Sequence, residues 1–172
     1  MAEAEGVIKY QLDFTRGDAP PAEAIAGLEP WREKLMARGV IGQDPARYGG
    51  YGFGNLSRRW PEAGNRFVIT GSQTGELARL GPEHYALVTD FSVPDNRVAA
   101  TGQTPPSSES LTHGWIYQLC PGAQFVFHVH SPEIWRNADK LGLPVSDPSA
   151  AYGTPEMAQE VRNILLKDPQ RS

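Results

Sequence analysis

The chain has 172 residues, of which 40% are hydrophobic, and its 16 Lys and Arg against 20 Asp and Glu give a formal net charge of −4. This length and apolar content predict one domain over residues 1–172. The charges are mixed, without the basic cluster of a nucleic-acid binder, and no apolar run approaches the roughly 20 residues that span a bilayer.

Two further features indicate a cytoplasmic protein without membrane or nucleic-acid partners. The start, Met1–Gly6, lacks the basic and apolar regions of a signal peptide. The single cysteine, Cys120, excludes an internal disulfide and is expected to be a buried thiol without chemistry.

The N-terminal third predicts a strand, a helix and a tight loop. Apolar residues alternate with polar ones over Ile8–Phe14, the pattern of a half-buried strand or edge arm. Leu28, Trp31 and Leu35 then fall on one face of a helix. The segment Tyr48–Gly54 has four glycines among three aromatic residues, which predicts a tight loop that positions the next segment of the chain.

The middle of the chain predicts antiparallel pairing. Strands are expected over Arg66–Thr70, Tyr85–Phe91 and Arg97–Ala100. The last two are separated only by Val93–Asn96, a natural tight turn. So short a connection requires antiparallel strands, which argues against a doubly wound parallel sheet.

The last third predicts two helices around a strand. Pro105–Glu109 is expected to open a helix, with a serine as N-cap and the glutamate in its first turn, that runs to about Cys120. Gln124–His130 reads as a strand. Thr154 is the expected N-cap of a final helix. Strands and helices therefore alternate along the chain, as in an α/β fold.

The sequence His128-Val-His130 is the most informative chemical feature. Side chains two apart in a strand point to the same face and can place two imidazoles on one cation such as Zn²⁺. An unliganded pair of partly buried histidines is the alternative interpretation.

Three turns could serve a substrate. Ser107, Ser108 and Glu109 combine hydroxyls and a carboxylate at a helix start, where an anion is favoured and a glutamate can act as a base. The turns Gly54–Ser57 and Thr70–Gly75 offer amides and hydroxyls that suit a phosphate. An ordinary capped helix and ordinary turns are the alternative.

Taken in order, these segments resemble the class II aldolase and adducin family over roughly residues 28 to 166. The matching blocks are Gly54-Asn-Leu-Ser57-Arg58, Phe67-Val-Ile-Thr70, Ser107-Ser-Glu109 with His113, Ile116-Tyr117, His128-Val-His130-Ser131-Pro132 and Ala151-Tyr-Gly-Thr154.

The resemblance implies an α/β fold whose central, largely antiparallel sheet is flanked by helices, in a homo-oligomer that is commonly a tetramer. It implies a divalent metal, most often Zn²⁺, held by His128, His130 and a third histidine further along the chain, and a glutamate matching Glu109 that moves protons. The positions matching phosphate contacts are Asn55, Thr70, Gly71, Ser107 and Ser108.

The third metal histidine of the family lies beyond the Ala-Tyr-Gly-Thr helix, and this sequence reaches Ser172 without it. His84 and His113 match a surface turn and a helix position, so structural roles are expected for both. Three explanations stay open: a truncated chain, a metal held by His128, His130, Glu109 and water, or a non-catalytic member.

The leading functional hypothesis is a metal-dependent, aldolase-type lyase that cleaves a carbon–carbon bond in a small, sugar-like hydroxy-carbonyl compound, phosphorylated or not. The retro-aldol mechanism implied by the family uses the metal to stabilise an enediolate while Glu109 shuttles the proton. Alternatives are an epimerase or dehydratase on the same scaffold, and a non-catalytic, adducin-like interaction domain. Retention of both strand histidines counts against the interaction domain.

Overall fold

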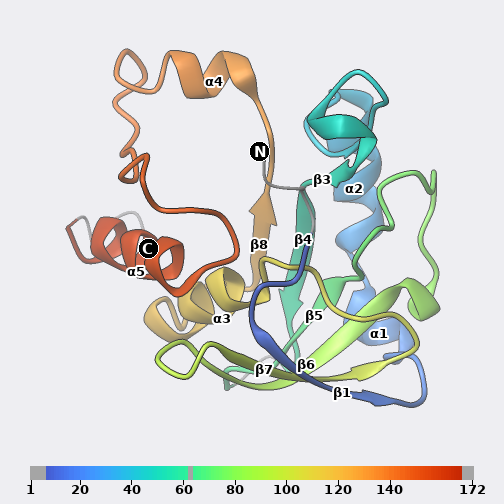
Figure 1. Cartoon of the computed structure of the whole chain (residues 1–172). Coiled ribbons are helices and arrows are strands. Elements are labelled where there is room, and N and C mark those ends of the chain that lie inside the picture. Colours follow the sequence, from blue (N-terminus) through green and yellow to red (C-terminus); the bar gives the residue numbers. More distant parts are fainter. Residues whose placement is uncertain (1–6, 62–63, 168–172) are drawn as a thin grey trace.

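The structure is a computed structural model that describes residues 7–61 and 64–167, so the start Met1–Gly6 and the end at Ser172 lie outside the described residues (Figure 1). Its strands are β1 (Gln11–Arg16), β2 (Gly42–Gln43), β3 (Gly52–Phe53), β4 (Asn55–Arg59), β5 (Phe67–Thr70), β6 (Tyr85–Ser92), β7 (Arg97–Gly102) and β8 (Phe125–His128). Its helices are α1 (Ala22–Ile25), α2 (Leu28–Ala37), α3 (Ser110–Leu119), α4 (Pro132–Arg136) and α5 (Pro155–Lys167), with short 3₁₀ turns η1 (Tyr48–Gly50) and η2 (Pro82–His84).

A mixed sheet forms the centre of the described chain. Its strand order is β1-β7-β6-β5-β4-β8, and all neighbours pair antiparallel except β1 and β7, which pair parallel. Helices flank this sheet, so the predicted α/β class with a central, largely antiparallel sheet is confirmed (Figure 1). The expected N-terminal strand is β1, at the edge of the sheet.

Alternate residues of β5 face two separate apolar clusters, which places the sheet between two helical layers. Phe67 and Ile69 pack with Leu111 of α3 and Ala158 of α5. Val68, between them, faces the opposite cluster, whose other members include Ala24, Leu28, Ile41 and Leu56. Each fully buried side chain of this size contributes about 1.5–3 kcal/mol of transfer free energy. Helices α1 and α2 therefore cover one face, and α3 and α5 the other (Figure 1).

The predicted β-hairpin is confirmed. Asn96 closes the turn between β6 and β7 by donating its backbone N–H to Val93 O at 3.1 Å. Its φ of +48° is left-handed, a conformation that asparagine tolerates better than most residues.

The predicted serine N-cap of α3 is wrong. The helix begins at Ser110, so Glu109 occupies the N-cap position instead of the first turn. Ahead of it, Pro106 forms an isolated bridge with Gly71, and Ser72 N donates to the carbonyl of the preceding proline at 2.8 Å. These contacts hold the chain extended up to Ser107, so the helix starts later than predicted and Glu109 lies at its N-terminus.

The first and last predicted helices correspond to α2 and α5, and the exposure of Trp31 is the one difference from the prediction. α2 covers the predicted segment, but Trp31 is 46% exposed and lies against Phe127, at 5.7 Å between ring centroids. α5 begins as expected, with Thr154 Oγ1 accepting from Met157 N at 3.3 Å. Among the described helices, none has the length and apolarity that a membrane crossing requires.

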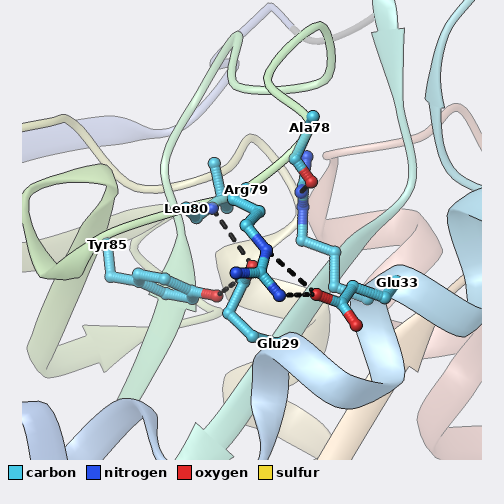
Figure 2. Close-up of polar contacts among 7 residues, drawn as sticks. Glu29, Glu33, Ala78, Arg79, Leu80 and Tyr85 are labelled. Atoms are coloured by element: carbon cyan, nitrogen blue, oxygen red, sulfur yellow. Dashed lines mark hydrogen bonds and ion pairs between the residues drawn. The ribbon is translucent and has the colours of Figure 1, made fainter.

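Helix α2 is tied to the loop before β6 by buried polar contacts. Arg32 is 3% exposed and donates to the carbonyls of Ala78, Thr74 and Leu77 at 3.1, 3.3 and 2.5 Å. Glu29 accepts from Tyr85 Oη at 3.0 Å and from Leu80 N at 3.1 Å (Figure 2). At the surface, Arg79 pairs with Glu33 at 2.6 Å (Figure 2).

We expect Arg32→Met to lower the free energy of unfolding by about 2–4 kcal/mol, because it removes a buried charge-assisted donor and leaves carbonyls unpaired. Arg79→Met is the matched control, since the Arg79 side chain is 82% exposed and the ion pair it makes is screened by solvent. Urea unfolding of both variants measures the difference. Equal losses would show that Arg32 is not a structural anchor.

Candidate metal and substrate site

The site forms where the start of β4 lies beside the end of β8. In their antiparallel register Asn55 lies directly opposite His128. Gly54, just before Asn55, has φ +75°, and a Cβ there would overlap Ile41 and come within 3.0 Å of His128 O. A glycine is therefore required to bring the two strand ends this close. Asn55 Nδ2 lies 3.1 Å from His128 Nδ1.

The two histidines lie side by side, as the spacing predicted, with ring centroids 4.8 Å apart. The observed strand is shorter than expected, because β8 ends at His128. His130 lies beyond the strand, and its backbone N–H donates to Val40 O at 2.7 Å. The rings of Tyr48 and Phe53 lie 4.7 and 5.5 Å from the His130 ring. The glycine-rich loop thus supplies aromatic walls to the histidine pair.

Burial lowers the pKa of both imidazoles. For His128 burial brings the pKa to about 4, and for His130 burial, helped by His128 and Arg47, also brings it to about 4. Both rings are therefore neutral near pH 7, and a neutral imidazole is the form that binds metal ions.

Glu109 is a buried carboxyl at the start of α3. It is 6% exposed, and its Oε2 accepts from Thr112 Oγ1 at 3.1 Å. Within the described part of the chain its Oε1 is buried without a hydrogen-bond partner. Burial raises the pKa of Glu109, which the Thr112 hydrogen bond and the charge of Lys9 partly oppose. A buried carboxyl with a raised pKa is suited to accept and return a proton.

A small polar cavity of about 40 Å³ brings most of the predicted site residues together. Six of them line it: Asn55, Gly71, Ser107, Ser108, Glu109 and His128. Thr70 and His130 are not among its lining residues, and the Thr70 hydroxyl instead accepts from Leu56 N at 3.2 Å. The described residues that line the cavity include no Lys or Arg, so an anion in it would be bound by amides and hydroxyls.

A larger and mainly apolar groove of about 610 Å³ adjoins this cavity, and His128 lines both. His130 also lines the groove. Its outer wall comes from α4 and the segment after it, through Ile134, Trp135, Leu143, Pro144 and Val145. A volume of this size is typical of small-molecule sites.

The described residues do not contain a group of three or more His, Cys, Asp or Glu side chains placed to hold a metal ion. The role of Glu109 as a third metal ligand therefore stays a prediction. His84 accepts from Gly81 N at 3.0 Å, and the fully buried His113 lies 2.7 Å from Ser57 Oγ, so both take the structural places expected of them.

Sequence reasoning did not find the polar network behind the site. Ser57 Oγ lies between His113 Nδ1 and Tyr117 Oη, at 2.7 and 2.8 Å. No local pattern joins residues 56 and 60 positions apart. The buried free thiol of Cys120, in contrast, is as predicted.

The chain belongs to the class II aldolase and adducin family: the model of the class II aldolase and adducin N-terminal domain matches residues 46–162. Among solved structures, the chain is similar to an L-fuculose 1-phosphate aldolase, with a TM-score of 0.57 and 21% sequence identity. The match covers 83% of this chain and 66% of that protein. A comparison with curated proteins found no match. The predicted family is thus confirmed, and the similar structure supports the fold.

Proposed function

We propose that the chain is a metal-dependent, aldolase-type lyase that cleaves a carbon–carbon bond in a small hydroxy-carbonyl compound, of the sugar or sugar-phosphate class. We also propose that it works in the cytoplasm as a homo-oligomer and uses zinc. Family membership supports the reaction class, and the neighbouring structure is named for an aldolase of a sugar phosphate.

One observation carries the proposal: of two adjacent neutral imidazoles, one lines a polar cavity that a buried carboxyl also lines. His128 lines this cavity and has the His130 ring 4.8 Å away. Glu109 lines it from α3. A purely structural domain has no physical need to place a buried carboxyl and two adjacent imidazoles this close together.

The residues present fit a divalent cation in their chemistry. Two neutral histidine nitrogens suit Zn²⁺, which accepts nitrogen and oxygen ligands and leaves positions for water and substrate. His128 and His130 are the proposed ligands. When bound, the metal would supply Lewis-acid stabilisation of the negative charge that develops on the substrate oxygens.

The residues of the chain have separable roles in the cleavage. As the carbon–carbon bond breaks, the β-hydroxyl becomes an aldehyde and the bonding electron pair moves to the α-carbon and its carbonyl oxygen as an enolate or enediolate. Glu109 is the proposed group that accepts the proton from the β-hydroxyl and returns it to the α-carbon. Asn55, Gly71, Ser107 and Ser108 would hold the polar end of the substrate, and Thr70 would support β4 from behind.

The first test is the metal content of protein purified without chelator or nickel affinity. We expect near-stoichiometric zinc or a related metal in the wild type and little in His128→Ala/His130→Ala, by elemental analysis. His84→Ala is the matched control, because His84 bonds to its own turn and does not line the site. It should retain the metal.

Metal in the wild type would justify screening sugar phosphates for release of an aldehyde. Equal metal in the wild type and the double variant would refute the proposed ligands. No metal in any of the three proteins would sink the lyase hypothesis.

A second candidate, a non-catalytic, adducin-like interaction domain, is favoured by the exposed apolar surface around α4. Trp135 is 74% exposed, and Ile134 and Val145 are 49% and 55% exposed. Large exposed apolar patches are rare on soluble monomers and often mark interaction surfaces. The metal measurement separates the candidates, because this function requires no cation.

A further inference from the structure

The hydrogen bond between Asn55 and His128 has a chemical consequence for the proposed metal site. Both residues are set by the register of β4 and β8, in which they are direct cross-strand partners. Asn55 is 7% exposed, so water does not compete freely for its amide. Its Nδ2 stands 3.1 Å from His128 Nδ1.

The orientation of this amide determines which ring nitrogen carries the proton. An amide NH₂ group only donates, so Nδ1 of His128 must accept, and a neutral imidazole then has its proton on Nε2. In that tautomer Nε2 has no lone pair for a metal ion. The Asn55 Oδ1 atom is meanwhile buried without a hydrogen-bond partner among the described residues.

A 180° flip of the Asn55 amide exchanges its Oδ1 and Nδ2 atoms, which are nearly equal in size. With the ring proton on Nδ1, Oδ1 would then accept a hydrogen bond from His128 Nδ1–H, and Nε2 would present a lone pair. Metal-binding histidines commonly have their other ring nitrogen fixed by such an acceptor, which orients the ring and raises its basicity.

We propose that Asn55 is a positioning residue that selects the tautomer of His128, and that cation binding reverses its amide. The inference rests on the proposed metal-dependent function and gives Asn55 a role beyond the predicted phosphate contact. Gly54 supports it, because its left-handed backbone and missing Cβ allow Asn55 to lie beside the His128 strand.

The test compares Asn55→Leu, which removes the amide, with Asn55→Asp, which can only accept at neutral pH. Zinc affinity is measured by competition with a chelating dye. We expect Asn55→Leu to bind zinc about 10–100-fold more weakly, and Asn55→Asp to bind it at least as tightly as the wild type. Thr74→Val is the control, since Thr74 lines the same cavity and its hydroxyl donates to Gly71 O at 2.9 Å.

The second readout is the protonation of the imidazole nitrogens by ¹H–¹⁵N NMR, which is tractable because the chain has four histidines. We expect the His128 proton on Nε2 in the metal-free wild type and on Nδ1 in the zinc form and in metal-free Asn55→Asp. Unchanged zinc affinity in Asn55→Leu, or a proton on Nδ1 in the metal-free wild type, overturns the proposal. If the wild type binds no zinc, the lyase proposal fails, and the metal-free tautomers of the three proteins still decide the role of Asn55.

Discussion

Replacing Glu109 by glutamine is expected to lower turnover by about 10²–10⁴-fold on the sugar phosphate that the zinc-loaded wild type cleaves. Glutamine keeps the shape of the side chain but cannot take up or release a proton. The carboxyl lines the polar cavity, is 6% exposed and has its pKa raised by burial, which are properties common to proton-exchanging groups in active sites. Initial rates of aldehyde release measure the loss.

The matched control is Thr112→Val, which removes the hydroxyl that donates to Glu109 Oε2 and leaves the carboxyl in place. It should cost far less activity than Glu109→Gln. Zinc content separates the two roles of Glu109 that the sequence left open. An inactive Glu109→Gln that retains zinc supports proton transfer, an inactive one that loses zinc makes Glu109 a metal ligand, and undiminished turnover rejects both.

Most of the sheet could be predicted because its strands have strong local signals, but β4 could not: a turn was predicted at Gly54–Ser57, whereas Asn55–Arg59 forms a strand between β5 and β8. Alternation over Ile8–Phe14 indicated the edge strand, and the short turn Val93–Asn96 required antiparallel pairing, which the structure has. The start of α3 could not be predicted in the same way. Two serines and a glutamate suit either an N-cap or a turn, and the outcome depends on the pairing of Pro106 with Gly71, 35 positions away.

The candidate site was predictable where it depends on spacing and unpredictable where it depends on register. The two-residue spacing places His128 and His130 on one face of an extended chain, and their rings lie 4.8 Å apart although His130 is beyond the end of β8. The contact of Asn55 with His128 spans 73 positions and exists because β4 and β8 pair in one particular register. The hydroxyl of Thr70 faces the backbone of β4, and its predicted phosphate contact stays a prediction.

The buried histidine of α3 is expected to make the protein strongly sensitive to acid. His113 is 1% exposed, and burial, with a smaller contribution from His128, lowers its pKa from 6.5 to about 3. Between these values the unfolded chain binds a proton that the folded chain excludes. The stabilisation from neutral His113 is therefore complete above pH 6.5 and is lost as the pH falls toward 3.

The expected slope is about 1.4 kcal/mol per pH unit, or roughly 5 kcal/mol over the whole window. His113→Gln removes this titration, so its free energy of unfolding should lie below that of the wild type at pH 7 and approach or exceed it by pH 5. Urea unfolding at pH 7, 6 and 5 measures both curves. The difference between the two proteins cancels the titration of the remaining histidines and carboxyls.

Tyr117→Phe provides the control for the loss of the polar network itself. Tyr117 Oη bonds to the same Ser57 hydroxyl that contacts His113, at 2.8 Å, but a tyrosine binds no proton between pH 5 and 7. Its removal should lower stability by a similar amount at each pH. If the free energy of unfolding of His113→Gln also differed from that of the wild type by the same amount at each pH, the folded protein would accept a proton on His113. The buried imidazole would then not be the source of the acid sensitivity.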